Sequence, residues 1–144
     1  MSQDVLLPAI GPDEAPFWEY TRKGELRIQQ CSGCERLRFP PRPMCPDCHS
    51  TDSHWTLVSG RGTVWSYVVP HPPLLPQFMP LAPYHVLTVA LDENPTIRLL
   101  GNLVEKAGDP INAIDPATIE IGMAVQVGFE AVNDEIHMPR WVRV

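Results

Sequence analysis

The stretch CSGCERLRFPPRPMCPDCHS, residues 31–50, decides the fold, because it holds all four cysteines of the 144-residue chain. They form two Cys-x-x-Cys pairs, Cys31/Cys34 and Cys45/Cys48, and ten residues separate the pairs. Three chemistries use such pairs: a metal site, disulfides, and a covalently attached c-type haem, whose Cys-x-x-Cys-His signature is matched by CPDCH. Other features of the sequence decide between these three interpretations.

The N-terminal residues MSQDVLLPAIGPDEAP lack the basic start and the apolar segment of a signal peptide. We therefore expect a cytoplasmic protein, in which a reducing environment disfavours disulfides. Haem attachment would require export, and it would leave Cys31 and Cys34 without a role. No apolar run in the sequence approaches the roughly 18–20 residues that a membrane span needs, so we expect no membrane partner.

Metal binding is the interpretation that uses all four cysteines. Zn²⁺ prefers four thiolates at about 2.3 Å in a tetrahedron, and each Cys-x-x-Cys turn supplies two of them. The pattern predicts a zinc ribbon with Cys31, Cys34, Cys45 and Cys48 as ligands, although a mononuclear iron site would have the same sequence. A closed shell of four thiolates leaves no open coordination position, so we expect a structural metal. His49 is then an exposed neighbour rather than a ligand.

Seventeen prolines favour loops and strands over long helices. One short helix is predicted over residues 13–23, with Asp13 as N-cap and Gly24 as stop. From residue 60 onward the apolar residues alternate in the manner of β-strands. Five strands are predicted there, over residues 62–71, 84–92, 95–104, 123–133 and 135–144.

The predicted fold is mainly β: a short N-terminal helix, a rubredoxin-like zinc ribbon, and then a five-stranded OB-fold barrel. The predicted division is residues 1–24 for the N-terminal arm and helix, 25–59 for the ribbon and 60–144 for the barrel.

Charge is spread unevenly over a chain of net charge −6. Six basic residues face three acidic ones between Arg22 and Cys48, whereas from His49 onward ten acidic residues face five basic ones. A nucleic-acid binder needs a basic field, and this chain offers one local patch at most. A single-stranded nucleic-acid module stays the alternative, since Trp65 and Tyr67 are two apart and should share a strand face.

Three features each leave two interpretations open. The arginines of the ribbon, Arg36, Arg38 and Arg42, either offset the negative charge of the metal site or bind an anion. The proline-rich loop 70–83 is either a lid on its own barrel or an apolar surface for a partner or an acyl chain. The aromatic helix residues pack either on the protein's own core or against a partner.

The sequence contains no recognisable catalytic set. It has neither a glycine-rich phosphate loop nor a Gly-x-Ser-x-Gly elbow, and its five histidines are scattered. His71, at the start of the proline-rich loop, is the one histidine that merits a test. We therefore expect no catalysis by the isolated chain.

The order of motifs resembles one known family. The aromatic helix FWEYTRKGEL is followed by Cys-x-x-Cys, FPPR, CPDC and then SGRGTVWSY at the start of the barrel. This order is similar to that of the zinc-ribbon/OB-fold acyl-CoA-associated proteins, the domain-of-unknown-function family thirty-five. The resemblance covers about residues 14–143.

The resemblance implies an accessory subunit of a hetero-oligomer. Its partner would be a thiolase-superfamily enzyme, either a thiolase or an aldolase acting on acyl-CoA, including steroid side-chain CoA esters; an enoyl-CoA hydratase is the alternative. Within the motifs, the four cysteines transfer as structural zinc ligands, and Arg42 transfers as a position of FPPR. Arg42 and Arg38 are the candidate contacts for the phosphates of CoA.

Overall fold

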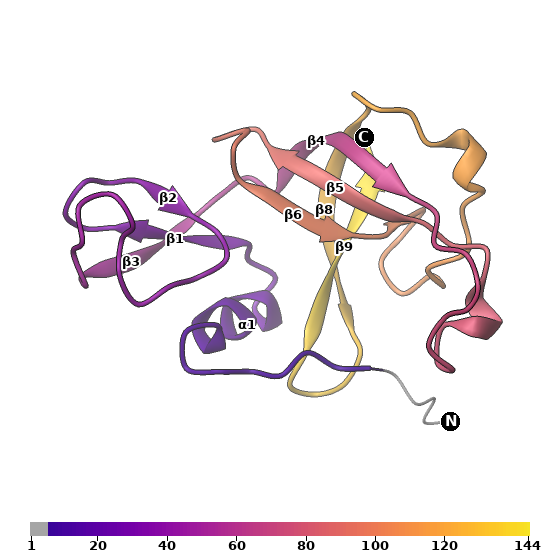
Figure 1. Cartoon of the computed structure of the whole chain (residues 1–144), viewed down its shortest axis with the longest axis horizontal. Coiled ribbons are helices and arrows are strands. Elements are labelled where there is room, and N and C mark those ends of the chain that lie inside the picture. Colours follow the sequence, from indigo (N-terminus) through magenta and orange to yellow (C-terminus); the bar gives the residue numbers. More distant parts are fainter. Residues whose placement is uncertain (1–5) are drawn as a thin grey trace.

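The structure, a computed structural model that describes residues 6–144, contains two β-sheets with one α-helix packed below them (Figure 1). The smaller sheet has three strands in the order β2-β1-β3, and the larger has six in the order β6-β5-β4-β8-β9-β7. These elements confirm the predicted mainly β class, with a helix, a ribbon and then an OB-like barrel.

The strands of the smaller sheet are β1 (Arg27–Cys31), β2 (Leu37–Arg38) and β3 (Ser53–Leu57). The strands of the larger sheet are β4 (Arg61–Val68), β5 (Val86–Leu91), β6 (Arg98–Gly101), β7 (Leu103–Val104), β8 (Ala124–Ala131) and β9 (His137–Arg143). The helices are α1 (Ala15–Arg22) and two short 3-10 helices, η1 (Met79–Leu81) and η2 (Pro116–Thr118). Neither they nor α1 is long and apolar enough to cross a membrane.

The barrel core consists of alternate residues of its strands, as the sequence pattern predicted. The buried side chains at these positions include Val64, Leu87, Val89, Leu99, Val125 and Trp141. Each aliphatic side chain of this size contributes about 1.5–3 kcal/mol when it leaves water. The strands are therefore held by their inward faces, and the outward faces are free to vary.

The segment predicted as one strand over 95–104 forms two strands, β6 and β7, so the sheet has six strands rather than five. β6 pairs antiparallel with β5, whereas β7 pairs parallel with β9. The break at Asn102 carries the chain from one edge of the sheet to the other and closes the barrel. A Cβ atom at Gly101 would lie 2.7 Å from the ring of Trp141, so this close crossing requires glycine.

Asn102 also makes the hydrogen bonds that hold this corner. Its side-chain nitrogen Nδ2 donates to the backbone carbonyl of His85 at 2.7 Å. Its backbone carbonyl accepts from the backbone amide of Trp141 at 2.9 Å. Nη1 of Arg140 donates to Oδ1 of Asn102 at 3.0 Å, and Nε2 of His85 accepts from the amide of Leu103 at 2.6 Å. Burial lowers the pKa of His85, so this ring stays neutral near neutral pH.

Helix α1 starts one residue later than the cap predicted. Its N-cap is Glu14 rather than Asp13, and the carboxylate of Glu14 accepts from the backbone amide of Gly11 at 3.0 Å. The helix stops where expected, because Gly24 adopts φ 75° and its amide donates to the carbonyl of Thr21 at 3.0 Å.

The aromatic residues of α1 pack on the protein's own core. Phe17 is buried, meets Trp18 edge to face at a ring distance of 5.1 Å and lies 5.7 Å from Phe39 of the ribbon. Tyr20 lies 6.3 Å from Trp55 of β3. The helix also touches β1, β8 and β9, so one continuous hydrophobic cluster extends from the ribbon into the barrel.

The linker of residues 58–60 joins the two sheets and is hydrogen-bonded to the barrel. The carboxylate of Glu93 accepts from the amide of Ser59 at 2.6 Å and from its hydroxyl at 3.2 Å. We propose that the predicted division at residue 60 marks the border between ribbon and barrel, with α1 belonging to the core of both.

Candidate functional site

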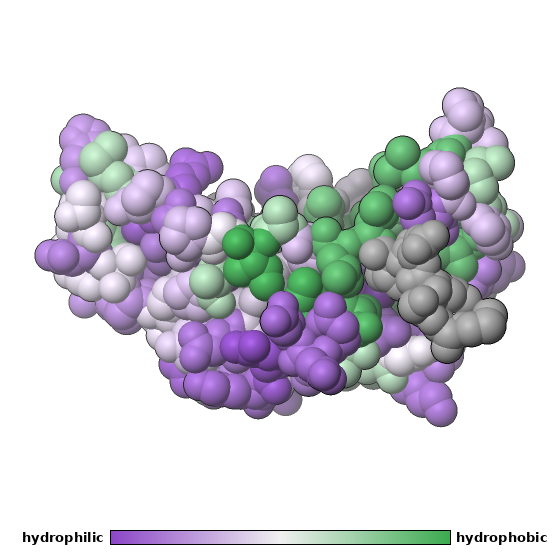
Figure 2. Space-filling model, turned by 90° about the horizontal axis from the view of Figure 1, so that it is seen from below, coloured by the Kyte–Doolittle hydropathy of each residue, from purple (hydrophilic) through white to green (hydrophobic). Residues whose placement is uncertain are grey.

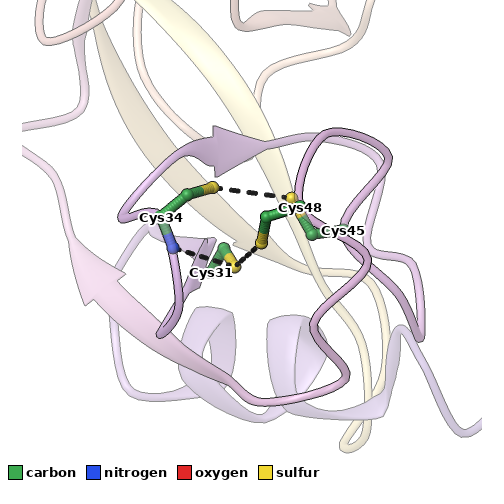
Figure 3. Close-up of side chains that lie close together, drawn as sticks. All are labelled: Cys31, Cys34, Cys45 and Cys48. Carbon is green, nitrogen blue, oxygen red and sulfur yellow. Dashed lines mark hydrogen bonds between the residues drawn. The ribbon is translucent and has the colours of Figure 1, made fainter.

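The four cysteines of the ribbon form one compact cluster (Figure 3). Their sulfurs all lie within 4.8 Å of one another, with Cys31 Sγ 3.4 Å from Cys48 Sγ and Cys34 Sγ 3.6 Å from Cys45 Sγ. Four thiolates in a tetrahedron with bonds of about 2.3 Å would have sulfurs roughly 3.8 Å apart. All four cysteines are free, so the cluster fits a four-thiolate metal site and not disulfides. It is the one group of three or more His, Cys, Asp or Glu in residues 6–144 that is placed to hold a metal.

Both cysteine turns are built by the same backbone pattern. The residue after each second cysteine, Glu35 or His49, adopts a positive φ, 64° and 61° respectively. Its amide donates to the carbonyl of the first cysteine of the pair, at 2.9 Å for Glu35 and 3.0 Å for His49. His49 is therefore a turn residue with an exposed side chain, outside the cluster, as the sequence predicted.

Backbone amides aimed at the sulfurs favour thiolates. The amide of Cys34, with that of Gly33, donates to Cys31 Sγ, and these bonds together with the neighbouring thiols lower the pKa of Cys31 to about 6. The amides of Cys48 and Asp47 lower the pKa of Cys45 in the same way. For Cys34 the amide of Arg36 acts in the same direction, but burial and the adjacent cysteines outweigh it and raise its pKa to about 12. A divalent cation at the centre would stabilise all four thiolates together.

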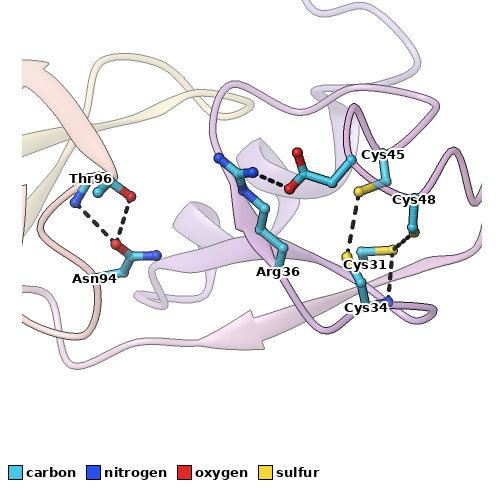
Figure 4. A network of polar contacts seen from close by, with 8 residues as sticks. Cys31, Cys34, Arg36, Cys45, Cys48, Asn94 and Thr96 are labelled. Atoms are coloured by element: carbon cyan, nitrogen blue, oxygen red, sulfur yellow. Dashed lines mark hydrogen bonds and ion pairs between the residues drawn. The ribbon is translucent and has the colours of Figure 1, made fainter.

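The three arginines of the ribbon differ in their surroundings. Arg36 forms an ion pair with Asp47, which ties the segment after the first cysteine pair to the second pair; Figure 4 shows Arg36 beside the cluster. Arg38 is buried, and its Nη2 donates to the carbonyl of Arg42 at 2.9 Å. Arg42 is exposed, and its backbone is held by two hydrogen bonds with the side chain of Gln29.

This difference bears on the predicted contacts with CoA. Nε and Nη1 of Arg38 are covered and have no hydrogen-bond partner in the described structure, so Arg38 supports the loop from inside. The side chain of Arg42 is the one of this pair that a phosphate in solution can reach. A CoA contact at Arg42 stays a prediction.

The loop 70–83 borders a groove of about 980 Å³ at one end of the barrel. Phe78 stacks on Tyr84 at a ring distance of 5.7 Å and contributes to the groove wall together with Leu81. The opposite wall is the β8–β9 hairpin, where Nε of Arg140 forms an ion pair with Glu130 at 2.8 Å. Sequence reasoning found the apolar loop and the strands that carry Glu130 and Arg140, but it missed the second wall, because no local pattern shows that these strands face the loop.

Apolar surface is also visible on the face seen from below. A band of hydrophobic residues crosses the middle of this face beside a strongly hydrophilic region (Figure 2). Exposed apolar side chains of the N-terminal arm include Leu6, Leu7 and Ile10, and Leu6 contributes to the groove.

The histidines do not assemble into a catalytic group. His54 is held by Ser32 Oγ at 3.0 Å and by Gln30 Oε1 at 3.1 Å, His85 is buried at the barrel corner, and His71 is exposed in the loop. These placements give the three rings separate structural or solvent contacts rather than a shared site.

The structure corrects one part of the nucleic-acid interpretation. The pairing of β4 with β5 shifts between Val64 and Ser66, which marks a β-bulge at Trp65. Trp65 faces outward next to the buried Val64 and is 52% exposed, whereas the bulge returns Tyr67 to the core face, so the two rings do not share a face. The expected pair of stacking aromatics is wrong.

Residues 18–53 match the family model of the ChsH2 rubredoxin-like zinc ribbon domain, and residues 55–130 match that of the ChsH2 C-terminal OB-fold domain. The chain belongs to the ChsH2 (DUF35) family. The family match, the fold and the four close cysteines together support a structural zinc, and they confirm the resemblance drawn from the motifs.

Three relatives illustrate the family. A probable enoyl-CoA hydratase alpha subunit from Thermomonospora curvata is 39% identical over 132 residues, which are 92% of this chain and 38% of the relative. The 3-oxo-4,17-pregnadiene-20-carboxyl-CoA hydratase alpha subunit from Mycobacterium tuberculosis is 34% identical over 137 residues, which are 95% of this chain and 38% of the relative. A chain of the solved Ltp2-ChsH2(DUF35) aldolase superposes with a TM-score of 0.79 and 38% identity, over 95% of this chain and 98% of that chain.

The chain thus spans 38% of the length of both hydratase subunits, but nearly the whole of the ChsH2-type chain in the aldolase. Two of these relatives are described as hydratase alpha subunits, and the third is a chain of an aldolase.

Proposed function

We propose that this chain is a non-catalytic accessory subunit that binds a thiolase-superfamily enzyme, an aldolase or a thiolase acting on acyl-CoA, and supports its activity. One observation carries the proposal: the chain matches a ChsH2-type chain of the Ltp2-ChsH2(DUF35) aldolase over nearly its entire length. The lack of a histidine-based catalytic group among the described residues is consistent with this role.

The proposed metal ligands are Cys31, Cys34, Cys45 and Cys48. With zinc bound, four thiolates would join the two cysteine turns into one rigid unit without an open coordination position. The ribbon would then act as a fixed docking element, and the metal would take no part in chemistry.

Two features support a role in binding the CoA ester. Arg42 presents an exposed guanidinium for a phosphate, and the groove offers an apolar wall along loop 70–83 for an acyl group. A steroid side-chain CoA ester is the proposed substrate class of the assembly, on the strength of the named substrate of the M. tuberculosis relative.

An enoyl-CoA hydratase subunit is the second candidate function. Both hydratase alpha subunits contain a region that is at least 34% identical to this chain. In this case the partner would add water to a carbon–carbon double bond instead of cleaving a carbon–carbon bond.

Co-expression with the thiolase-like protein of the adjacent gene tests the proposal. The two chains should co-elute in size-exclusion chromatography. The partner without this chain should cleave a β-hydroxyacyl-CoA with only a small part of the activity of the complex. The same complex assayed with an enoyl-CoA separates the two candidates. Separate elution, together with unchanged activity of the partner alone, would contradict the accessory role.

A further inference from the structure

A stacked pair of side chains, Trp65 and Arg98, stands on the outer face of the barrel sheet. Trp65 follows the buried Val64 in β4 and so faces outward, where its ring is 52% exposed. The guanidinium carbon of Arg98 lies 3.8 Å from the centre of that ring. Neither residue lines the groove or belongs to the ribbon, so this stack is a separate feature of the surface.

The sheet is built so that Arg98 can reach across a whole strand. β5 lies between β6 and β4, and Ala90 of β5 pairs with Arg98 on one side and with Thr63 on the other. Two strand spacings are about 10 Å, which a long side chain can cross only over a small residue. Ala90 supplies that small residue, and it is only 9% exposed although it faces outward.

A neutral, partly apolar strip continues from the stack along the same face. Leu100 is 69% exposed and Val68 is 59% exposed. Between them Thr88 pairs with Leu100 of β6 and with Ser66 of β4. Exposed apolar side chains that form a patch, unlike single ones, are typical of surfaces that meet another protein.

The guanidinium of Arg98 is fixed in place but has no acceptor. Within residues 6–144, no ion pair or side-chain hydrogen bond involves it; the ion pairs of the described structure belong to Arg27, Arg36 and Arg140. Stacking on the indole of Trp65 holds the plane of the guanidinium and leaves the N–H groups at the edge of the guanidinium free. Such a guanidinium is prepared for a carboxylate that accepts two parallel hydrogen bonds.

We propose that the Trp65–Arg98 stack and the adjoining Leu100 strip form a docking site for a protein segment that carries an Asp or Glu next to an aliphatic side chain. Tryptophan and arginine are the residues that most often dominate the energy of protein interfaces. The inference rests on the proposed function, because it names a surface through which the accessory subunit would hold its catalytic partner.

Charge decides between a protein partner and the other occupants. In a symmetric pair of identical chains through this face, Arg98 would need a carboxylate from the same strip of the other chain, and the strip carries none, which disfavours a second copy. A nucleic acid would need several cations along the face, and this face offers Arg98 with only Arg61 further along β4, in a chain of net charge −6. A carboxylate within an apolar segment satisfies both the unpaired cation and the exposed Leu100.

The first test measures binding of the full chain to its co-expressed aldolase partner. Arg98→Glu should weaken the affinity by about 30-fold or more, and Arg98→Lys, which keeps the charge but loses the two-pronged geometry, should weaken it less. Lys106→Glu makes the same change of charge in an exposed loop and should bind like the wild type. Circular dichroism should show equal folding of all variants, and wild-type affinity of Arg98→Glu would overturn the proposal.

A second measurement does not depend on the partner. In ¹H–¹⁵N NMR spectra, a blocked Leu-Glu-Leu peptide at millimolar concentration should shift the Nε–H signals of Arg98 and Trp65 in a saturable manner. The matched Leu-Gln-Leu peptide and a short oligo-dT should not. If the wild type binds no aldolase but these shifts appear, the proposed function fails and the docking site stands. Equal shifts with Leu-Gln-Leu or oligo-dT, or none with Leu-Glu-Leu, would overturn the docking site itself.

Discussion

Replacing Asn102 with alanine would remove the side chain that holds the closing corner of the barrel. This side chain is 9% exposed, donates to the carbonyl of His85 at 2.7 Å and accepts from Nη1 of Arg140 at 3.0 Å. His85 is fully buried, so its carbonyl would lose its partner without gaining water. A buried polar group left unpaired costs about 1–3 kcal/mol. Because Arg140 keeps its ion pair with Glu130, we expect a total loss of about 2–4 kcal/mol in the free energy of unfolding.

Urea unfolding followed by tryptophan fluorescence measures this loss, because Trp141 lies in the core beside the corner. Thermal unfolding should show a Tm lower by about 6–12 °C, at roughly 3 °C per kcal/mol for a chain of this size. Asn112→Ala is the matched control, since Asn112 is exposed in the loop after β7 and should change stability by less than about 0.5 kcal/mol.

Two outcomes would refute the reasoning. If the free energy of unfolding of Asn102→Ala lies within about 0.5 kcal/mol of the wild-type value, which is about the uncertainty of the extrapolation, the side-chain bonds do not hold the corner. If Asn112→Ala is equally destabilised, the effect belongs to asparagine replacement in general and not to barrel closure.

Three further predictions concern the metal, pH and the shared core. Cys45→Ser should lower the zinc content of the purified chain, measured by mass spectrometry of the metal, from one per chain to well below one; an unchanged content would contradict the proposed ligands. Burial lowers the pKa of His85 in the folded chain, so the unfolded chain binds more protons and stability should fall as pH drops below about 6.5, by at most about 1.4 kcal/mol per pH unit. Urea unfolding between pH 8 and 5 should show this slope in His71→Gln and lose it in His85→Gln, whereas equal slopes would exclude His85 as its source. Phe17→Ala should cost about 3–5 kcal/mol, because Phe17 is buried between ribbon and barrel, and Phe78→Ala in the loop should cost less than half of that; equal losses would contradict a central place for Phe17.

Local sequence patterns predicted the structural features that depend on residues close together in the chain. The spacing of the cysteines indicated a closed metal cluster, because a Cys-x-x-Cys turn is a local structure whose geometry is nearly fixed. Alternating apolar residues indicated the inward faces of the barrel strands, including Val64 and Val89, which pair with each other. Gly24 marked the end of α1 because few other residues adopt its positive φ.

Features that depend on distant pairings were not predictable in this way. The split at Asn102 needs β5 and β9 on either side of the chain, and no local signal in the sequence records that. The bulge at Trp65 changes the face of a residue without changing the alternation that sequence reasoning uses. Arg38 was expected either to offset the charge of the metal site or to contact a CoA phosphate, but the fold of its loop covers it.

The shared core below the two sheets has a consequence for how an assembly could be aligned. Phe17 contacts Phe39 of the ribbon, while α1 also touches β8 and β9, which form one wall of the groove. The ribbon therefore cannot swing relative to the barrel without exposing buried aromatic surface. An enzyme that binds the ribbon would therefore also fix the orientation of the groove and its distance from the enzyme. Binding at the ribbon would determine where the groove lies in the assembly.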